Sequence, residues 1–280
     1  MPEENKRKHI YDAEATVLTG HLKLPVSQKI EPQAHSKLVK EGGYFSQVSD
    51  GYQLESVLSF RSAYSHVAGN RDLKPGRGWN TLTTTVVEGL NVLEVLTADR
   101  VVGQIITEHP LEGHVPTISF LGTRFENLRI AGHPVELELD HQIIGPKPAK
   151  DAGYARDAGF VSRVSSQYER IRKSKELPKE LQERYNQLSS TLGSAEAVEC
   201  SLVNQAAGGY PGMSFGHVIR IPGFGIITLA KVTVKHEELH AKTKVPKKTT
   251  VSLTMIDLKL GCAIHGTVPI GGGRQNGESG

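Results

Sequence analysis

Val135-Glu-Leu-Glu-Leu-Asp140 alternates strictly between apolar and acidic residues, and this alternation decides the fold. Successive side chains of a β-strand point to opposite faces, so the stretch turns its apolar residues inward and its carboxylates toward water. Residues 125–130 and the turn Ala131-Gly-His-Pro134 precede it, which predicts a strand, a turn and a second strand. We therefore expect this segment to belong to an antiparallel sheet.

The same signal recurs along the chain. Stretches that alternate, or that are rich in Thr and Val, are separated by segments that hold most of the Gly and Pro. About a dozen strands of this kind are enough for two packed sheets. The fold class is expected to be mainly β, an antiparallel β-sandwich or a partly open barrel. The further stretches are residues 52–60, 81–87, 100–107, 197–203, 217–221, 226–234 and 251–260.

One segment follows a different period. Apolar residues between Val161 and Leu192 recur three and four positions apart, the spacing of one face of a helix. Pro178 stands where a second helix would begin, and Gly193 stands where it would end. We therefore expect an inserted pair of amphipathic helices over residues 161–192.

The ends of the chain differ from its middle in composition. Residues 1–12 are highly charged, and residues 271–280 are Gly-rich and polar. Such segments offer little apolar surface to bury, so we expect a flexible N-terminal segment and a disordered tail. Residues 13–270 are expected to form a single β-rich domain that carries the helical insertion.

Charge and hydropathy exclude several classes. The 33 Lys and Arg residues against 30 Asp and Glu residues leave a formal net charge of +3, so no nucleic-acid partner is predicted. The sequence holds no apolar run long enough to span a bilayer as a helix. The charged N-terminus is not followed by the apolar run of a signal peptide, which favours a cytoplasmic location.

A zinc-hydrolase motif is matched by His236-Glu-Glu-Leu-His240, with Glu237 in the position of the general base. This chemistry requires a helix that brings both imidazoles to one face. Residues 225–234 alternate as a strand instead, and Pro246 limits any helix behind the motif. We interpret the motif as a polar strand end; a zinc-dependent hydrolase using His236, Glu237 and His240 is one alternative, and adventitious metal binding is another. No other metal or cofactor is predicted.

A nucleophile-elbow motif is matched by Gly212-Met-Ser-Phe-Gly216, with Asp257 and His265 downstream. The elbow requires a buried strand before the serine and a helix after it. Ser214 instead follows a Gly-rich loop and precedes a strand-like stretch, so a turn between strands is the favoured interpretation.

Four histidines and three carboxylates lie close together in sequence and could bind a divalent ion if the turns of one sheet edge gathered them. Scattered loop histidines are the favoured interpretation. The alternating Glu136, Glu138 and Asp140 are interpreted as the wet face of a strand rather than as a calcium site. The group comprises His109, His114, His133 and His141 with Glu108, Glu112 and Asp140.

The two cysteines, Cys200 and Cys262, each lie in an apolar, strand-like run. Neither has a second cysteine at metal-ligand spacing. Buried thiols are favoured over one disulfide between neighbouring strands.

Part of the chain resembles a known family. Val95-Leu-Thr-Ala-Asp-Arg-Val-Val102, residues 118–120 and residues 125–135 resemble the central pattern of choice-of-anchor P-type domains, which are β-rich bacterial surface or secreted domains. Leu239-His240 and residues 256–266 resemble their closing strands. The resemblance implies an all-β domain with a structural or adhesive role, a cell-surface or secreted location, and His240 and His265 near each other in paired strands. It implies no catalytic residues.

Three function classes follow. The favoured one is a non-catalytic, structural or interaction protein that associates with itself, because exposed sheet edges need a partner or protection. The second is a module that binds a small ligand or carbohydrate on an aromatic platform of Trp79, Tyr44, Tyr52 and Tyr64. The third is the zinc-dependent hydrolase.

Overall fold

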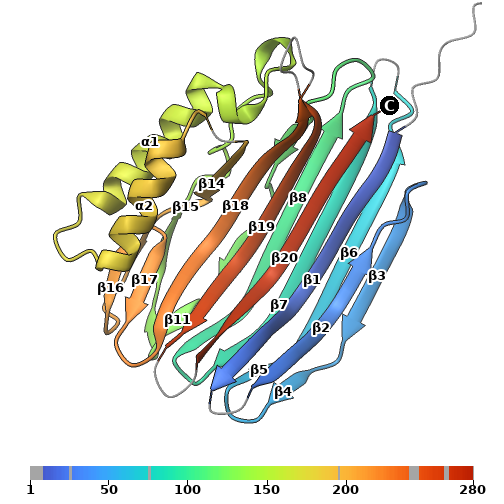
Figure 1. Cartoon of the computed structure of the whole chain (residues 1–280). Helices are drawn as coiled ribbons and strands as arrows, with labels where there is room; N and C mark the ends of the chain where they lie inside the picture. The colour runs from blue at the N-terminus through green and yellow to red at the C-terminus, as the bar shows by residue number, and fades with distance from the viewer. Residues whose placement is uncertain are drawn as a thin grey trace, which may run out of the picture.

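The alternating stretches form two antiparallel sheets that lie face to face with their strands aligned, as the computed structural model shows (Figure 1). The structure describes residues 9–24, 27–74, 77–194, 196–239, 246–261 and 265–279. Over these ranges neither sheet closes on itself. The expected mainly β, sandwich-like fold with two helices is confirmed.

Within the described residues, the first sheet has eight strands in the order β16-β17-β18-β19-β20-β1-β2, with β14 also paired to β18. The strands are β1 (His9–Leu24), β2 (Gln28–Lys37), β14 (Ala197–Ser201), β16 (Met213–Phe215), β17 (Val218–Ile221), β18 (Gly225–Leu239), β19 (Pro246–Leu260) and β20 (His265–Ser279).

The second sheet has ten strands over the same described ranges, and a two-stranded sheet of β13 and β15 accompanies the pair. Long strands β6, β7 and β8 form its centre, β3 and β4 form one edge, and short strands follow β8 on the other edge. The strands are β3 (Gly43–Ser49), β4 (Tyr52–Leu54), β5 (Leu58–Phe60), β6 (Ser62–Arg71), β7 (Trp79–Val92), β8 (Leu96–His109), β9 (Thr117–Ser119), β10 (Arg124–Glu126), β11 (Arg129–Ile130), β12 (His133–Pro134), β13 (Glu136–Leu139) and β15 (Val203–Ala207).

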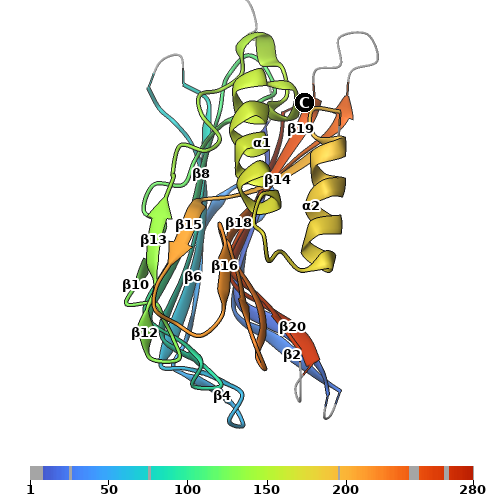
Figure 2. The same cartoon turned by 90° about the vertical axis from the view of Figure 1, so that its left-hand side faces the viewer.

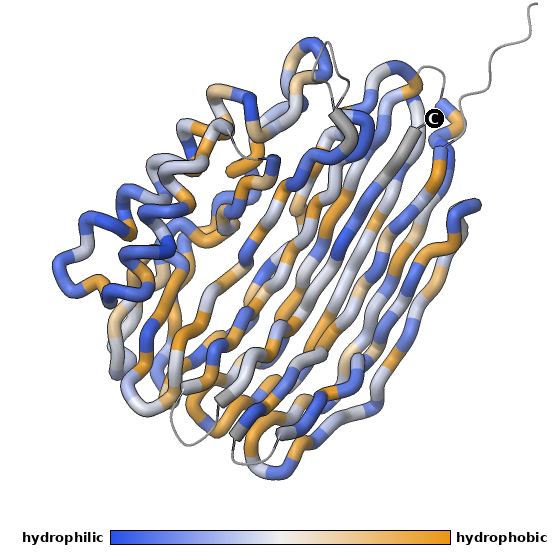
Figure 3. Tube along the Cα trace, in the orientation of Figure 1, coloured by the Kyte–Doolittle hydropathy of each residue, from blue (hydrophilic) through white to orange (hydrophobic). Residues whose placement is uncertain are grey.

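Helices α1 (Ala158–Arg172) and α2 (Lys179–Thr191) lie where the sequence predicts them, after the short turns η1 (Ala149–Asp151) and η2 (Tyr154–Arg156). The Asp157 side chain caps α1 by accepting from the Phe160 N–H, and Pro178 precedes the first turn of α2. The helices cover one end of the sandwich (Figure 2), and hydrophilic residues recur along them (Figure 3). No helix in the described part of the chain is long and apolar enough to cross a membrane.

Within the segment 271–280, expected to be disordered, residues 271–279 instead form the second half of β20, which pairs with both β1 and β19. Gln275 is buried and links the sheets, because its amide group bonds to Thr83, Thr107 and the carbonyl of Ile105. Gly273 of this strand is required by close packing, since a Cβ at this position would lie 2.8 Å from Thr83. The tail prediction was wrong because small residues were read as flexibility.

The N-terminal prediction also needs correction. β1 begins at His9, so residues 9–12 are paired with β20 rather than flexible. His9 and Tyr11 are buried against Trp79 in a small second cluster between the sheets. Residues 52–60, expected as one strand, form the hairpin of β4 and β5 because residues 55–57 turn.

The eight-stranded sheet bends along a line that crosses four neighbouring strands. At this line successive residues are buried on each strand, and beyond it the inward-facing set changes from odd to even positions, or the reverse. Ala230 and Gly271 take positive φ angles of 44° and 67° there. The buried pairs are Val17–Leu18, Leu229–Ala230, Met255–Ile256 and Ile270–Gly271.

Candidate functional site

The segment that matches the zinc-hydrolase motif runs along a strand. His236 and Glu237 lie on β18, opposite Thr249 and Lys248 of β19. Successive strand residues face opposite ways, so His236 is buried while Glu237 pairs with lysines on the outer face. The helical geometry that the hydrolase alternative requires is not formed. His240 lies outside the described residues.

His236 instead anchors the turn that leads into α1. Its Nδ1 lies 3.1 Å from Thr249 Oγ1, its Nε2 accepts from the Ala155 N–H at 3.4 Å, and its ring stacks on Tyr154. Burial, with a smaller contribution from Arg156, lowers the pKa of His236 to about 4. The imidazole is therefore neutral and structural at neutral pH.

The elbow motif does not form an elbow. Ser214 lies in β16 opposite Ile219 of β17, and the chain turns at Gly216. Asp257 lies on β19, three strands away from β16, and forms an ion pair with Lys231. The side chain of His265 lies outside the described residues. No nucleophile is presented by this strand hairpin.

The histidine and carboxylate group is not brought together. His109 is buried and its ring contacts that of His9, His133 is exposed on β12, and His141 bonds to the carbonyl of Thr123. Over the described ranges, no three His, Cys, Asp or Glu side chains are grouped so as to hold a metal ion.

The expected aromatic platform is not formed either. Trp79 is buried and stacks on His9, and Tyr52 is half-buried against Phe60. Only Tyr44 and Tyr64 of the four aromatic residues are exposed, and they lie on the paired strands β3 and β6. The ligand-binding alternative therefore loses the Trp79 stack on which it depended.

The described surface feature that stands out is the edge strand β3, Gly43-Tyr-Phe-Ser-Gln-Val-Ser49. It pairs with β6 on one side only, and six of its seven residues are exposed. It contains no charged residue and no proline. Tyr44 is 64% exposed and Val48 is 68% exposed. An edge strand with these properties offers unpaired backbone groups to another strand.

The other edges carry the devices that discourage such pairing. β2, the edge of the eight-stranded sheet on the same side, contains Pro32 and charged residues at Lys29, Glu31 and Lys37. The opposite edge of the ten-stranded sheet is cut into strands of two or three residues, and helices cover the region of β14. Proline, lysine, short strands and covering helices all block edge-to-edge pairing. β3 has none of them.

The outer face of the ten-stranded sheet next to β3 carries two apolar rows. Strand register places four apolar residues side by side in each row, with the polar Ser46, His66, Thr84 and Gln104 between the rows. We call them the Val48 row (Val48 and Tyr64, which are exposed, continued by the buried Val86 and Val102) and the Tyr44 row (Tyr44, Ala68, Leu82 and Ile106). Both rows end at the open edge of β3.

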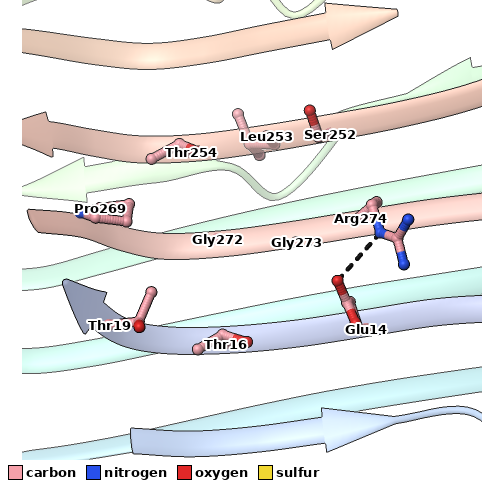
Figure 4. A pocket seen from close by; sticks show the side chains of 10 residues that line it. All are labelled: Glu14, Thr16, Thr19, Ser252, Leu253, Thr254, Pro269, Gly272, Gly273 and Arg274. Atoms are coloured by element: carbon pink, nitrogen blue, oxygen red, sulfur yellow. Dashed lines mark hydrogen bonds and ion pairs between the residues drawn. The ribbon is translucent and has the colours of Figure 1, made fainter. Parts of the chain in front are cut away.

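The outer face of the eight-stranded sheet is polar by contrast. A furrow of about 220 Å³ runs over Gly272, between Thr16 of β1 and Thr254 of β19 (Figure 4). Arg274 at its rim pairs with Glu14 at 3.1 Å, so the charge there is already compensated. The lining contains no aromatic residue on which a sugar would stack. This furrow presents hydroxyl groups but no arrangement of catalytic side chains.

Two buried polar features lie beneath the helices. Tyr185 of α2 forms a hydrogen bond with His217, and burial lowers the pKa of His217 to about 3. Gln167 of α1 forms hydrogen bonds with the backbone of Ser201. Cys200 is a buried thiol without a disulfide, and burial raises its pKa, as expected for an inert structural residue. Cys262 lies outside the described residues.

The comparisons with known proteins place the chain in a family. A family model described as a domain of unknown function (DUF8256) matches residues 9–235, which is most of the chain, and the chain belongs to this family. No curated protein matches the sequence.

Proposed function

We propose that this protein is a non-catalytic interaction protein that associates with copies of itself through β3. The observation that carries the proposal is the contrast between edges: β3 is exposed, uncharged and free of proline, whereas β2 beside it carries Pro32 and charges. Main-chain hydrogen bonds along an added strand supply affinity, and the side chains on both faces supply specificity.

The second copy is favoured over a charged partner by the surroundings of β3. The charged row that borders the apolar rows is paired within itself, since Arg61 and Arg100 both lie 3.7 Å from Glu88 carboxylate oxygens. Two arginines share one carboxylate, so only a single net positive charge remains there, which is little to select a strongly charged partner. A structural or adhesive role, as the resemblance to choice-of-anchor P-type domains implies, agrees with this proposal.

Light scattering of the purified chain tests the proposal. The unmodified chain is expected to approach twice its 30.5 kDa mass or more as its concentration rises. Val48→Lys places a charge on β3 and should keep the chain monomeric. Gln33→Lys places the same charge on the already protected β2 and should leave the mass unchanged. A monomer at every concentration, or equal effects of the two lysines, would contradict the proposal.

A further inference from the structure

We infer that two copies pair their β3 strands antiparallel about a two-fold axis at Ser46, so that the apolar rows of the two copies join into continuous strips. This inference rests on the self-association proposed above and adds its register and the surface that results. It follows from the pattern of side chains along β3 and from the register of β3 with β6.

The faces of β3 restrict the register. Tyr44, Ser46 and Val48 share the outer face, because they lie opposite the outward-facing Ala68, His66 and Tyr64 of β6. Residues opposite one another in an antiparallel pair point to the same face of the sheet. A two-fold axis perpendicular to the sheet therefore passes midway between the two copies of one residue, and both eight-stranded sheets then lie in the same layer.

Among such axes, the one at Ser46 uses the whole strand. It sets Tyr44 opposite the partner's Val48, and it sets Gly43 opposite the partner's Ser49. All seven residues of β3 are then paired, and the charged Glu41 and Asp50 stay outside the ladder. An axis at Gln47 would instead bring Asp50 opposite the partner's Tyr44, which exchanges an apolar pair for a charged residue beside an aromatic ring.

The joined surface follows directly from this register. The Val48 row of one copy meets the partner's Tyr44 at the junction and continues along the partner's Tyr44 row. The second strip is related to the first by the two-fold axis. Between them the polar positions also meet, with Ser46 opposite the partner's Ser46. On the outer face each side chain therefore faces one of its own polarity across the junction, as stable cross-strand pairs do, whereas on the inner face Phe45 lies opposite the partner's Gln47.

Disulfide cross-linking with single-cysteine additions tests the register. Ser46→Cys places two sulfurs on residues whose Cα atoms lie about 4.5–5.5 Å apart, within disulfide reach. Val48→Cys alone separates the two cysteines by four residues along the ladder, about 14 Å, which is beyond reach. We expect roughly tenfold or more covalent dimer for Ser46→Cys than for Val48→Cys under mild oxidation. The unmodified chain is the control for Cys200 and Cys262.

Cross-linking between two different cysteine variants provides the complementary test of the register. Tyr44→Cys and Val48→Cys chains should cross-link when mixed, and neither should cross-link alone. Covalent dimer from Val48→Cys alone would overturn the register. If Ser46→Cys gives no covalent dimer while light scattering still shows a dimer, the register is wrong and self-association stands. If Ser46→Cys gives no covalent dimer and the mass is that of a monomer, both the register and the proposed function fail.

Discussion

Tyr185 Oη lies 2.9 Å from His217 Nε2, and this buried contact ties α2 to the eight-stranded sheet. A second buried histidine, His236, holds the turn that leads into α1. The helical insertion is therefore attached to the sheet at two imidazoles that are neutral in the folded protein.

Acid is expected to lower the free energy of unfolding through these two histidines. Burial lowers the pKa of His217 to about 3 and that of His236 to about 4, with smaller contributions from Arg184 and Arg156. In the unfolded chain both bind protons near pH 6.5, so their stabilising effect is complete above about pH 6.5 and declines as the pH falls toward the folded-state values. The free energy of unfolding, measured with urea, should fall by about 2 kcal/mol per histidine between about pH 7 and pH 5.

His217→Phe provides the control for this effect. The variant loses one titrating group, so its unfolding free energy should fall less steeply with acid than that of the unmodified chain, whatever its stability at neutral pH. Carboxylate titration is shared by the two proteins and cancels in the comparison. Equal slopes would mean that His217 does not titrate between the folded and unfolded states as described.

Substitutions at the neighbouring residues Gln275 and Arg274 of β20 should differ in their cost to the free energy of unfolding. Gln275→Leu leaves the hydroxyls of Thr83 and Thr107 and the Ile105 carbonyl without their buried partner, and it should lower the free energy of unfolding by about 2–4 kcal/mol. Arg274→Gln removes ion pairs of a partly exposed residue and should cost less than about 1 kcal/mol. Urea denaturation measures both variants, and equal costs would contradict the tight packing of this strand.

His236 and Glu237, which lie on opposite faces of β18, should contribute differently to the free energy of unfolding. His236→Ala removes the bonds to Thr249 and Ala155 and should destabilise the protein by about 2–3 kcal/mol. Glu237→Gln removes two partly exposed ion pairs and should cost less than about 1 kcal/mol. Thermal denaturation with and without a chelator should give the same midpoint. A chelator-dependent midpoint that His236→Ala abolishes would restore the metal hypothesis.

Periodicity was sufficient to predict the sandwich and the helices. The helical spacing of Val164, Tyr168 and Ile171 was a clear signal, because α1 buries only one face and these residues lie on it. The bend of the eight-stranded sheet could not be predicted, since Ala230 changes the alternation through its φ angle and not through its polarity. The ordered β20 was missed because a Gly-rich stretch is also typical of a flexible tail. In β20, Gly273 is required instead because a larger residue would keep the two sheets apart.

The candidate site was predicted only in general terms. Exposed sheet edges were expected to mediate self-association, but which strand lies at an edge depends on pairing between distant segments. A signal for β3 was present in the uncharged stretch from Gly43 to Ser49, set between Glu41 and Asp50. His236 and Ser214 match the spacing of catalytic motifs but both lie in strands, because a match in spacing does not specify whether the segment is a helix or a strand.

Hydrogen exchange of the β3 amides at low and high protein concentration tests the central claim most directly. If β3 pairs with a second copy, amides of residues 43–49 should exchange more slowly as the concentration rises, because the added strand satisfies the outward-facing N–H groups. Amides of β2 should exchange at the same rate at both concentrations. Exchange from β3 that is independent of concentration, in a sample whose mass shows association, would contradict the assignment of the interface to this strand.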